Sequence, residues 1–278
     1  MFFEWLRWVL DQAAPPPEPQ PGPEYRAAIG PPEQPRPIDP DLHPDPTRPT
    51  RLYRFAHAAL RFLLPKLFRI RYEGPENLPS PPFIIASNHQ AWFDTLFLIT
   101  AFPSAPMIYT MAKRETVFNR RWKAWLVRQF GVFPISPSQG HLDEQGIASV
   151  YQVLHRGGVV LIFPEGSYSR GRRLRPLKVG VAHFALQAAV PICPVAISGI
   201  DSLRPAGQVT ISIGPAIYPD PPRWWSTSRQ VLKTVDSVRR AILRAFERGQ
   251  AARRARPSWP ERWRRRIRRR VGPEPLPT

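Results

Sequence analysis

The stretch Phe83–Asp94, reading Phe-Ile-Ile-Ala-Ser-Asn-His-Gln-Ala-Trp-Phe-Asp, constrains the fold of this chain most strongly. Its first three residues are an apolar run behind a pair of prolines, which predicts a buried strand. The run ends in small and polar residues, and the apolar segment Thr95 to Phe102 then predicts a helix. His89 and Asp94 are therefore expected on a strand-to-helix turn at the end of a sheet, where α/β proteins place their sites.

The spacing of His89 and Asp94 permits acid–base chemistry only if the chain bends between them. Residues five apart on an ideal helix point about 140° away from each other. If the turn brings them together, the carboxylate fixes the imidazole tautomer, and the histidine becomes a general base with one nitrogen free for a substrate proton. No Ser or Cys nucleophile lies beside His89. The alternative is a strand-end histidine bonded to the backbone, with Asp94 as a helix N-cap.

The pattern along the chain predicts an α/β fold with a mixed, largely parallel sheet flanked by helices. Strands are expected at residues 83–85, 106–111, 132–135, 159–163, 192–198 and 208–214. Helices are expected at residues 95–102, 119–130, 141–156, 178–190 and 229–250. A basic amphipathic helix is also predicted over residues 51–71, and Pro65 is expected to kink or end it.

The two ends of the chain differ in composition from its centre. Residues 1–12 are rich in Phe, Trp and Leu, and predict an amphipathic helix for a lipid interface or for packing on the protein itself. Residues 13–50 are proline-rich and predict a disordered linker, whereas residues 51–250 predict the folded domain. Residues 251–278 form a basic tail containing Trp and Arg. Such a tail can bind anionic headgroups or nucleic acid, or it can be solvated without a partner.

The net charge of +19 is unevenly distributed. Residues 1–50 hold four Arg, no Lys and eight Asp or Glu, a net of −4, so the rest of the chain carries +23. Such a body predicts a polyanionic partner, either nucleic acid or an anionic membrane surface. The single cysteine lies in an apolar run and predicts no disulfide or metal site. No apolar run reaches the ~18 residues that a spanning helix needs, and the N-terminus is a poor signal peptide.

Four ordered blocks in this chain resemble those of the glycerolipid acyltransferase family, whose best-known members are the 1-acyl-sn-glycerol-3-phosphate acyltransferases. The first is Asn88-His89-x-x-x-x-Asp94, and the third is Phe163-Pro164-Glu165-Gly166-Ser167. Lys113-Arg114-Glu115 with Gly131–Ile135 resembles the second block, and Val190–Val195 resembles the fourth. The likeness covers roughly residues 50 to 220 and identifies residues 51–250 as an acyltransferase domain.

The resemblance implies an enzyme of phospholipid biosynthesis that moves a fatty acyl group from a thioester to 1-acyl-sn-glycerol 3-phosphate, giving phosphatidic acid. The thioester, on coenzyme A or acyl carrier protein, is a co-substrate, and no cofactor or metal is expected. The catalytic residues would be His89 as general base and Asp94 as its partner. Substrate-binding roles would fall to Glu165, Gly166, Lys113, Arg114 and Arg170. The enzyme is expected on the cytoplasmic side of the cell membrane, as a peripheral or monotopic protein. Beside such a lipid enzyme, the basic tail is expected to adsorb to an anionic membrane surface rather than to nucleic acid.

One departure from the family pattern affects the expected acceptor. The family commonly has Arg directly after the Glu-Gly-Thr/Ser step, whereas this chain has Tyr168. A phenol cannot reproduce the bidentate grip of a guanidinium on phosphate. Either Arg170, Arg172 or Arg173 supplies the contact to the phosphate, or the acceptor is not lysophosphatidic acid. The first alternative function is therefore an acyltransferase for a different lysolipid or polar-lipid hydroxyl. The second is a non-catalytic basic protein that binds membranes or nucleic acid.

Overall fold

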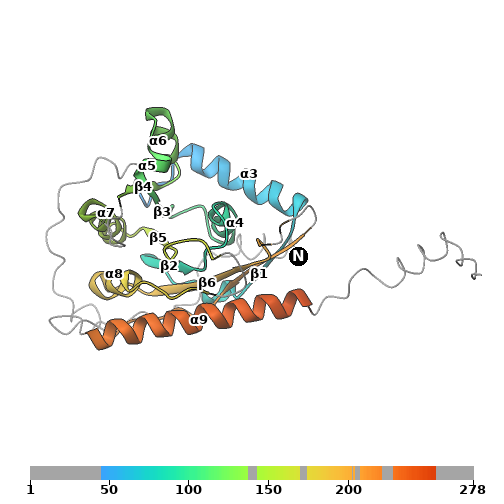
Figure 1. The fold of residues 1–278 in the computed structure, drawn as a ribbon. Helices are drawn as coiled ribbons and strands as arrows, with labels where there is room; N and C mark the ends of the chain where they lie inside the picture. Colours follow the sequence, from blue (N-terminus) through green and yellow to red (C-terminus); the bar gives the residue numbers. More distant parts are fainter. Residues whose placement is uncertain are drawn as a thin grey trace, which may run out of the picture.

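The computed structural model describes residues 45–136, 143–169, 174–201, 203, 207–220 and 228–254, which form a seven-stranded sheet with helices on both faces (Figure 1). The strands are β1 (Arg69–Glu73), β2 (Phe83–Ser87), β3 (Ile108–Lys113), β4 (Val132–Ile135), β5 (Val159–Ile162), β6 (Ile192–Ser198) and β7 (Gln208–Ile213). The helices are α3 (Arg51–Leu67), α4 (Asp94–Leu98), α5 (Arg114–Val117), α6 (Arg121–Arg128), α7 (Glu144–His155), α8 (Gly180–Ala188) and α9 (Ser228–Arg254). Two short 3-10 helices are η1 (Pro75–Asn77) and η2 (Ile99–Ala101).

The strand order is β1-β7-β6-β2-β5-β3-β4. Every neighbouring pair is parallel except β6 and β7, which are antiparallel, so the predicted mixed and largely parallel sheet is confirmed. Strand β2 lies at the centre, with Ile84 opposite Val160 of β5 on one side and Ile192 of β6 on the other. All five β2 residues are buried, as expected for a parallel strand covered on both faces.

Alternate residues of β2 enter two separate hydrophobic cores, because successive side chains of a strand point to opposite faces. Ile84 and Ala86 belong to the core formed with α7, α8 and α9. Phe83 and Ile85 belong to the core formed with α3, α4 and η2. These two layers lie on opposite sides of the sheet in Figure 1. The apolar stripes of the helices and the period of two in the strands together fix which residues are buried.

The helix predicted over residues 51–71 is shorter than expected. Thr50 caps its start, where the Thr50 hydroxyl accepts from Tyr53 N at 3.0 Å. Pro65 lies inside α3, and the helix ends two residues later at Leu67. The chain then enters β1, an edge strand that pairs with β7 and that the sequence pattern did not predict. Its alternation of charged and apolar residues, Arg-Ile-Arg-Tyr-Glu, suits a strand of which one face is exposed.

The predicted interfacial helix at residues 1–12 lies outside the described residues. Of the predicted linker at residues 13–50, the structure describes only residues 45–50. The basic tail predicted from residue 251 starts inside α9, which continues to Arg254, and the remainder of that tail is again outside the described part. None of the described helices is long and apolar enough to cross a membrane.

The carboxyl ends of the parallel strands β2, β5 and β3 share one edge of the sheet. Strand β2 leads directly into the turn that carries His89, and β5 leads into the turn that carries Glu165. Because β2 and β5 are neighbours, with Ala86 opposite Ile162, the two motif turns start side by side. The fold therefore places at one edge the segments that the sequence identified separately.

Candidate active site

The turn after β2 is anchored to the neighbouring strand β6 by the side chain of Asn88. Its amide Nδ2 donates to Ile197 O at 3.0 Å, and its Oδ1 accepts from Ile197 N at 2.8 Å. Asn88 is buried, so this pair of hydrogen bonds replaces the strand pairing that β2 gives up where it ends. The backbone that enters the site at His89 is therefore held in place from the side of β6.

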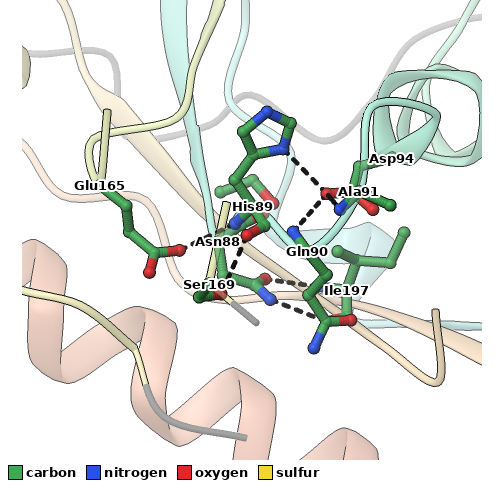
Figure 2. A network of polar contacts seen from close by, with 9 residues as sticks. Asn88, His89, Gln90, Ala91, Asp94, Glu165, Ser169 and Ile197 are labelled. Carbon is green, nitrogen blue, oxygen red and sulfur yellow. Dashed lines mark hydrogen bonds and ion pairs between the residues drawn. The ribbon is translucent and has the colours of Figure 1, made fainter. Parts of the chain in front are cut away.

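His89 and Asp94 meet directly, as Figure 2 shows. The distance from His89 Nδ1 to Asp94 Oδ2 is 2.9 Å. The same carboxylate oxygen accepts the backbone N–H groups of Gln90 at 2.5 Å and Ala91 at 2.9 Å. These bonds fold the chain back over residues 89–94, which supplies the bend that an uninterrupted helix would not allow.

The geometry excludes the alternative in which Asp94 is simply a helix N-cap. The N-cap position of α4 belongs to Phe93, whose side chain makes no capping bond, and Asp94 is the first helical residue. The Asp94 side chain is fully buried, while 16% of the His89 side chain is exposed. A buried carboxylate therefore orients an imidazole that solutes can still reach. In Figure 2 the second ring nitrogen of His89 points away from the network.

Glu165 joins the two motif turns through its carboxylate. Its Oε1 accepts from His89 N at 2.8 Å, and its Oε2 accepts from Arg175 N at 2.8 Å. Glu165 is 4% exposed, so these two hydrogen bonds satisfy a nearly buried charge. Gly166 follows with a φ of 71°, a conformation that favours glycine. Each carboxylate oxygen retains a second lone pair, so Glu165 can still accept a bond from a substrate hydroxyl.

Three further residues contact the histidine, and these contacts were not predicted from the sequence. Ser169 donates to His89 O from both its backbone N, at 2.7 Å, and its hydroxyl, at 2.9 Å. The His89 ring stacks on Phe163, with ring centroids 3.8 Å apart and an interplanar angle of 13°. Tyr168 contacts the same imidazole at 4.4 Å, tilted by 55°. The third block and the tyrosine that follows it thus surround His89 with two aromatic rings as well as a carboxylate.

The other predicted site residues are placed differently. Lys113 ends β3 and Arg114 begins α5, at the same sheet edge but on the far side of β5 from β2. The Arg114 guanidinium donates to Gln145 Oε1 of α7 at 2.7 Å. Arg170 lies outside the described residues. Among the residues that are described, no group of three His, Cys, Asp or Glu side chains could hold a metal ion.

This arrangement can remove a proton from a weak acid such as an alcohol. Asp94 keeps the Nδ1 side of His89 occupied and stabilises the imidazolium that forms when the other nitrogen gains a proton. Neither Ser87, whose hydroxyl donates to Asn88 O, nor Ser169, whose hydroxyl donates to His89 O, is bonded to the His89 ring. The geometry therefore favours a nucleophile brought by the substrate, with His89 acting as its base.

Comparison with known proteins shows which sequences this chain resembles. Residues 69–198 match the Acyltransferase family model. The chain is 28% identical over 143 residues to a chloroplastic 1-acyl-sn-glycerol-3-phosphate acyltransferase of Brassica napus, covering 51% of this chain and 40% of the relative. It is 36% identical over 152 residues to the lyso-ornithine lipid O-acyltransferase of Pseudomonas aeruginosa, covering 53% of this chain and 54% of the relative. In both cases the chain spans well under two thirds of the relative's length.

A solved structure shares the fold. The 1-acyl-sn-glycerophosphate acyltransferase PlsC of Thermotoga maritima superposes with a TM-score of 0.54, covering 75% of this chain and 80% of that chain. The sequence identity is 23%, so the likeness concerns the fold alone. The α/β architecture with its largely parallel sheet is the one that PlsC has.

Proposed function

We propose that this protein, whose residues 69–198 match the Acyltransferase family model, is an O-acyltransferase that acylates 1-acyl-sn-glycerol 3-phosphate to give phosphatidic acid. The observation that carries the proposal is the contact between His89 Nδ1 and Asp94 Oδ2 at 2.9 Å, beside the buried carboxylate of Glu165. The relatives whose names state this activity support the choice of reaction. The acyl donor is a thioester of coenzyme A or of acyl carrier protein.

In the proposed reaction, the free hydroxyl of the acceptor lies against the outward nitrogen of His89. As the hydroxyl oxygen attacks the thioester carbonyl carbon, its proton passes to Nε2, and Asp94 stabilises the resulting imidazolium. The tetrahedral intermediate then collapses, the carbon–sulfur bond breaks, and the leaving thiolate recovers the proton from His89. General-base assistance of this kind contributes about 10²–10⁴ in rate. Glu165 would hold the glycerol part of the acceptor with its remaining lone pairs.

Tyr168 favours a second candidate acceptor, a lysolipid without a phosphate monoester. Tyr168 contacts His89 and is 46% exposed, so it lies where an acceptor headgroup would pass. A phenol brings no positive charge to a phosphate monoester. The similarity to the lyso-ornithine lipid O-acyltransferase points in the same direction, because that protein's name gives an acceptor other than a lysophosphatidic acid. A lysolipid without a phosphate monoester is therefore the second candidate acceptor.

We also propose that the enzyme works at an anionic membrane surface, on the cytoplasmic side of the cell membrane. Helix α3 exposes a stripe of large apolar side chains, in which Phe55 is 74% and Phe62 is 57% exposed. These two residues are seven positions apart, two helical turns, and therefore share one face. Trp92, three residues after His89, is 73% exposed. An exposed apolar stripe with basic flanks suits a helix lying in the lipid interface, from which a lysolipid would reach the site.

One assay tests the proposed function. The purified full chain would be offered a labelled acyl thioester together with a panel of lysolipids. The acyl group would be carried either on coenzyme A or on acyl carrier protein. Acylation of 1-acyl-sn-glycerol 3-phosphate is expected, and His89→Ala should lower kcat by about 10²–10⁴ while vesicle binding persists. If the acyl group is transferred only to a lysolipid without a phosphate monoester, that lysolipid is the acceptor in place of 1-acyl-sn-glycerol 3-phosphate. Unchanged transfer by His89→Ala would remove His89 from its role. Absence of transfer, with retained binding to vesicles or RNA, would support a non-catalytic binding protein.

A further inference from the structure

The segment Leu174–Lys178 runs back along the turn that carries Glu165. Arg175 N donates to Glu165 Oε2 at 2.8 Å, and Lys178 N donates to Pro164 O at 2.7 Å. Two backbone hydrogen bonds three residues apart thus fix this segment against the third block. The side chain of Lys178 is therefore carried by backbone that is tied to the same turn as the candidate site.

The Lys178 side chain lies across the α-carbon of Gly166. A Cβ added to Gly166 would stand 2.6 Å from Lys178 Cε and 3.1 Å from Lys178 Nζ. The absence of a side chain at residue 166 therefore leaves the space through which the lysine stem passes. Gly166 also has the positive φ of 71° that favours glycine. The lysine and the glycine fit together, and the lysine remains exposed to solvent.

This lysine places a positive charge on the turn next to the reacting histidine. Gly166 directly follows Glu165, whose Oε1 contacts His89 N. Tyr168, two residues further on, contacts the His89 ring but carries no positive charge. Arg114, one of the cations that the sequence suggested, begins α5 on the far side of β5 from β2, and its guanidinium donates to Gln145 on α7. An ammonium group is a compact charge that binds phosphate without the fixed fork of a guanidinium.

We propose that Lys178 binds the phosphate of the acceptor and so determines the preference for a phosphate-bearing lysolipid. This inference rests on the proposed function, since it assigns a substrate group to the same site. The acceptor's hydroxyl would lie at His89 and its glycerol at Glu165. The phosphate would lie beyond Gly166, where the ammonium group meets it. Lys178 would thus supply the positive charge that Tyr168 lacks.

The test compares Lys178→Gln with Lys178→Arg and with Lys233→Gln, a control on α9 whose ammonium group pairs with Asp220. Each full-length variant would be assayed with acyl-coenzyme A and either 1-acyl-sn-glycerol 3-phosphate or the matching 1-acylglycerol, which lacks the phosphate. Lys178→Gln should raise KM for the phosphate acceptor by roughly tenfold to a hundredfold. Its kcat, its KM for acyl-coenzyme A and its kcat/KM for 1-acylglycerol should stay within about threefold of wild type. Lys178→Arg should recover most of the loss.

Three outcomes would overturn the inference: an unchanged KM for the phosphate acceptor, equal losses with both acceptors, or a rise confined to the KM for acyl-coenzyme A. The last outcome would assign Lys178 to the phosphates of the donor. A binding measurement separates this inference from the proposed function. Calorimetric titration of 1-acyl-sn-glycerol 3-phosphate into His89→Ala protein needs no turnover, and adding Lys178→Gln should weaken binding by at least about tenfold. Equal affinity of the two proteins for 1-acyl-sn-glycerol 3-phosphate would overturn the inference about Lys178, whichever acceptor the enzyme acylates.

Discussion

At the scale of single residues, His89 is oriented by groups from two segments of the chain, its own turn after β2 and the turn after β5. Asp94 holds Nδ1, Glu165 holds the backbone N–H, and Ser169 holds the carbonyl oxygen. Phe163 then lies flat against the ring at 3.8 Å. The hydrogen bonds fix the backbone and one ring nitrogen, whereas the stacked ring limits rotation of the imidazole out of its plane. Phe163 is therefore a positioning residue for His89, the proposed general base.

Replacing Phe163 by Leu should lower kcat by roughly tenfold to a hundredfold and leave KM for the acceptor nearly unchanged. Leucine keeps the apolar character and much of the volume but loses the flat surface, and small displacements of a catalytic group cost rate rather than binding. Phe163→Tyr keeps the stacked ring and should retain most of the activity. Initial-rate kinetics of both variants check the expectation. A Phe163→Leu enzyme with wild-type kcat would show that the stack does not position His89.

A second histidine links folding to pH. His57 of α3 is buried, and its Nε2 lies 3.1 Å from both Ile99 O and Phe102 O. Burial lowers the pKa of His57 below its ordinary value of 6.5, against the opposing effect of the two carbonyl groups, and the nearby Arg61 lowers it further. The neutral ring therefore joins α3 to the segment after α4 by donating to these carbonyl oxygens.

Acidification should destabilise the fold through His57. Above pH 6.5 the ring is neutral in the folded and unfolded chains alike, and its stabilising contribution is complete. As the pH falls below that value, the unfolded chain takes up the proton first, so the free energy of unfolding decreases by up to about 1.4 kcal/mol per pH unit until the native pKa is passed. Urea unfolding at several pH values measures this slope. His57→Gln should have a smaller slope, and an identical slope would contradict the assignment.

The predictability of the site differs from residue to residue. His89, Asp94 and Glu165 could be identified because each belongs to a short block, and each block follows an apolar strand. Phe163 and Ser169 belong to or adjoin the third block, but their contacts depend on how the β5 turn folds over the β2 turn. That packing is a property of tertiary structure and leaves no periodic signal. Asn88 was recognised as part of a block, yet its role as an anchor to β6 required the strand order.

At the scale of elements, the strands with continuous apolar runs were predicted well and β1 was not. Strands β2, β5 and β6 are buried on both faces, so their sequences are apolar without interruption. β1 lies at the edge of the sheet, and its charged residues continued the basic helical pattern of α3. The helix stops because β7 offers a pairing partner, which is information from the far end of the domain.

The turn after β1 provides a test of this edge. Gly74 has a φ of 71°, and a Cβ there would stand 2.2 Å from Ile213 O at the end of β7. Gly74→Ala should lower the free energy of unfolding by about 1–3 kcal/mol or more, since both backbone conformation and space oppose a side chain. Gly180, at the start of α8, is the matched control, because the nearest atom to its added Cβ is 3.9 Å away. Gly180→Ala should be neutral or stabilising by up to ~1 kcal/mol. Urea unfolding compares the two variants, and equal losses would contradict the expectation.

At the scale of the whole molecule, charge and exposed apolar side chains combine in α3. The helix turns Tyr53, His57 and Leu64 towards the core and leaves Phe55 and Phe62 exposed. Its basic residues lie beside the exposed stripe, and Lys66 stands 3.6 Å from the centre of the Phe62 ring. Helix α9 covers the opposite face of the sheet (Figure 1). One face of the molecule is thus suited to a lipid interface, in a chain with a net charge of +19.

Removing the apolar stripe should therefore weaken membrane binding more than an acidic substitution on α9 does. Phe55→Glu with Phe62→Glu is expected to lower the partition coefficient onto vesicles of 70% phosphatidylcholine and 30% phosphatidylglycerol by at least about tenfold, since each buried Phe contributes about 1.5–3 kcal/mol. Changing two uncharged residues to Glu also alters the charge, so Phe55→Ser with Phe62→Ser should reproduce most of the loss. Leu232→Glu, at a residue 61% exposed on α9, should bind as wild type does. Co-sedimentation in low and high salt separates the electrostatic contribution of the basic residues from the contribution of the apolar side chains. Salt screens the charges and leaves the burial of apolar surface unchanged. Equal loss in the α9 variant would mean that net charge alone, rather than the α3 stripe, holds the protein on the membrane.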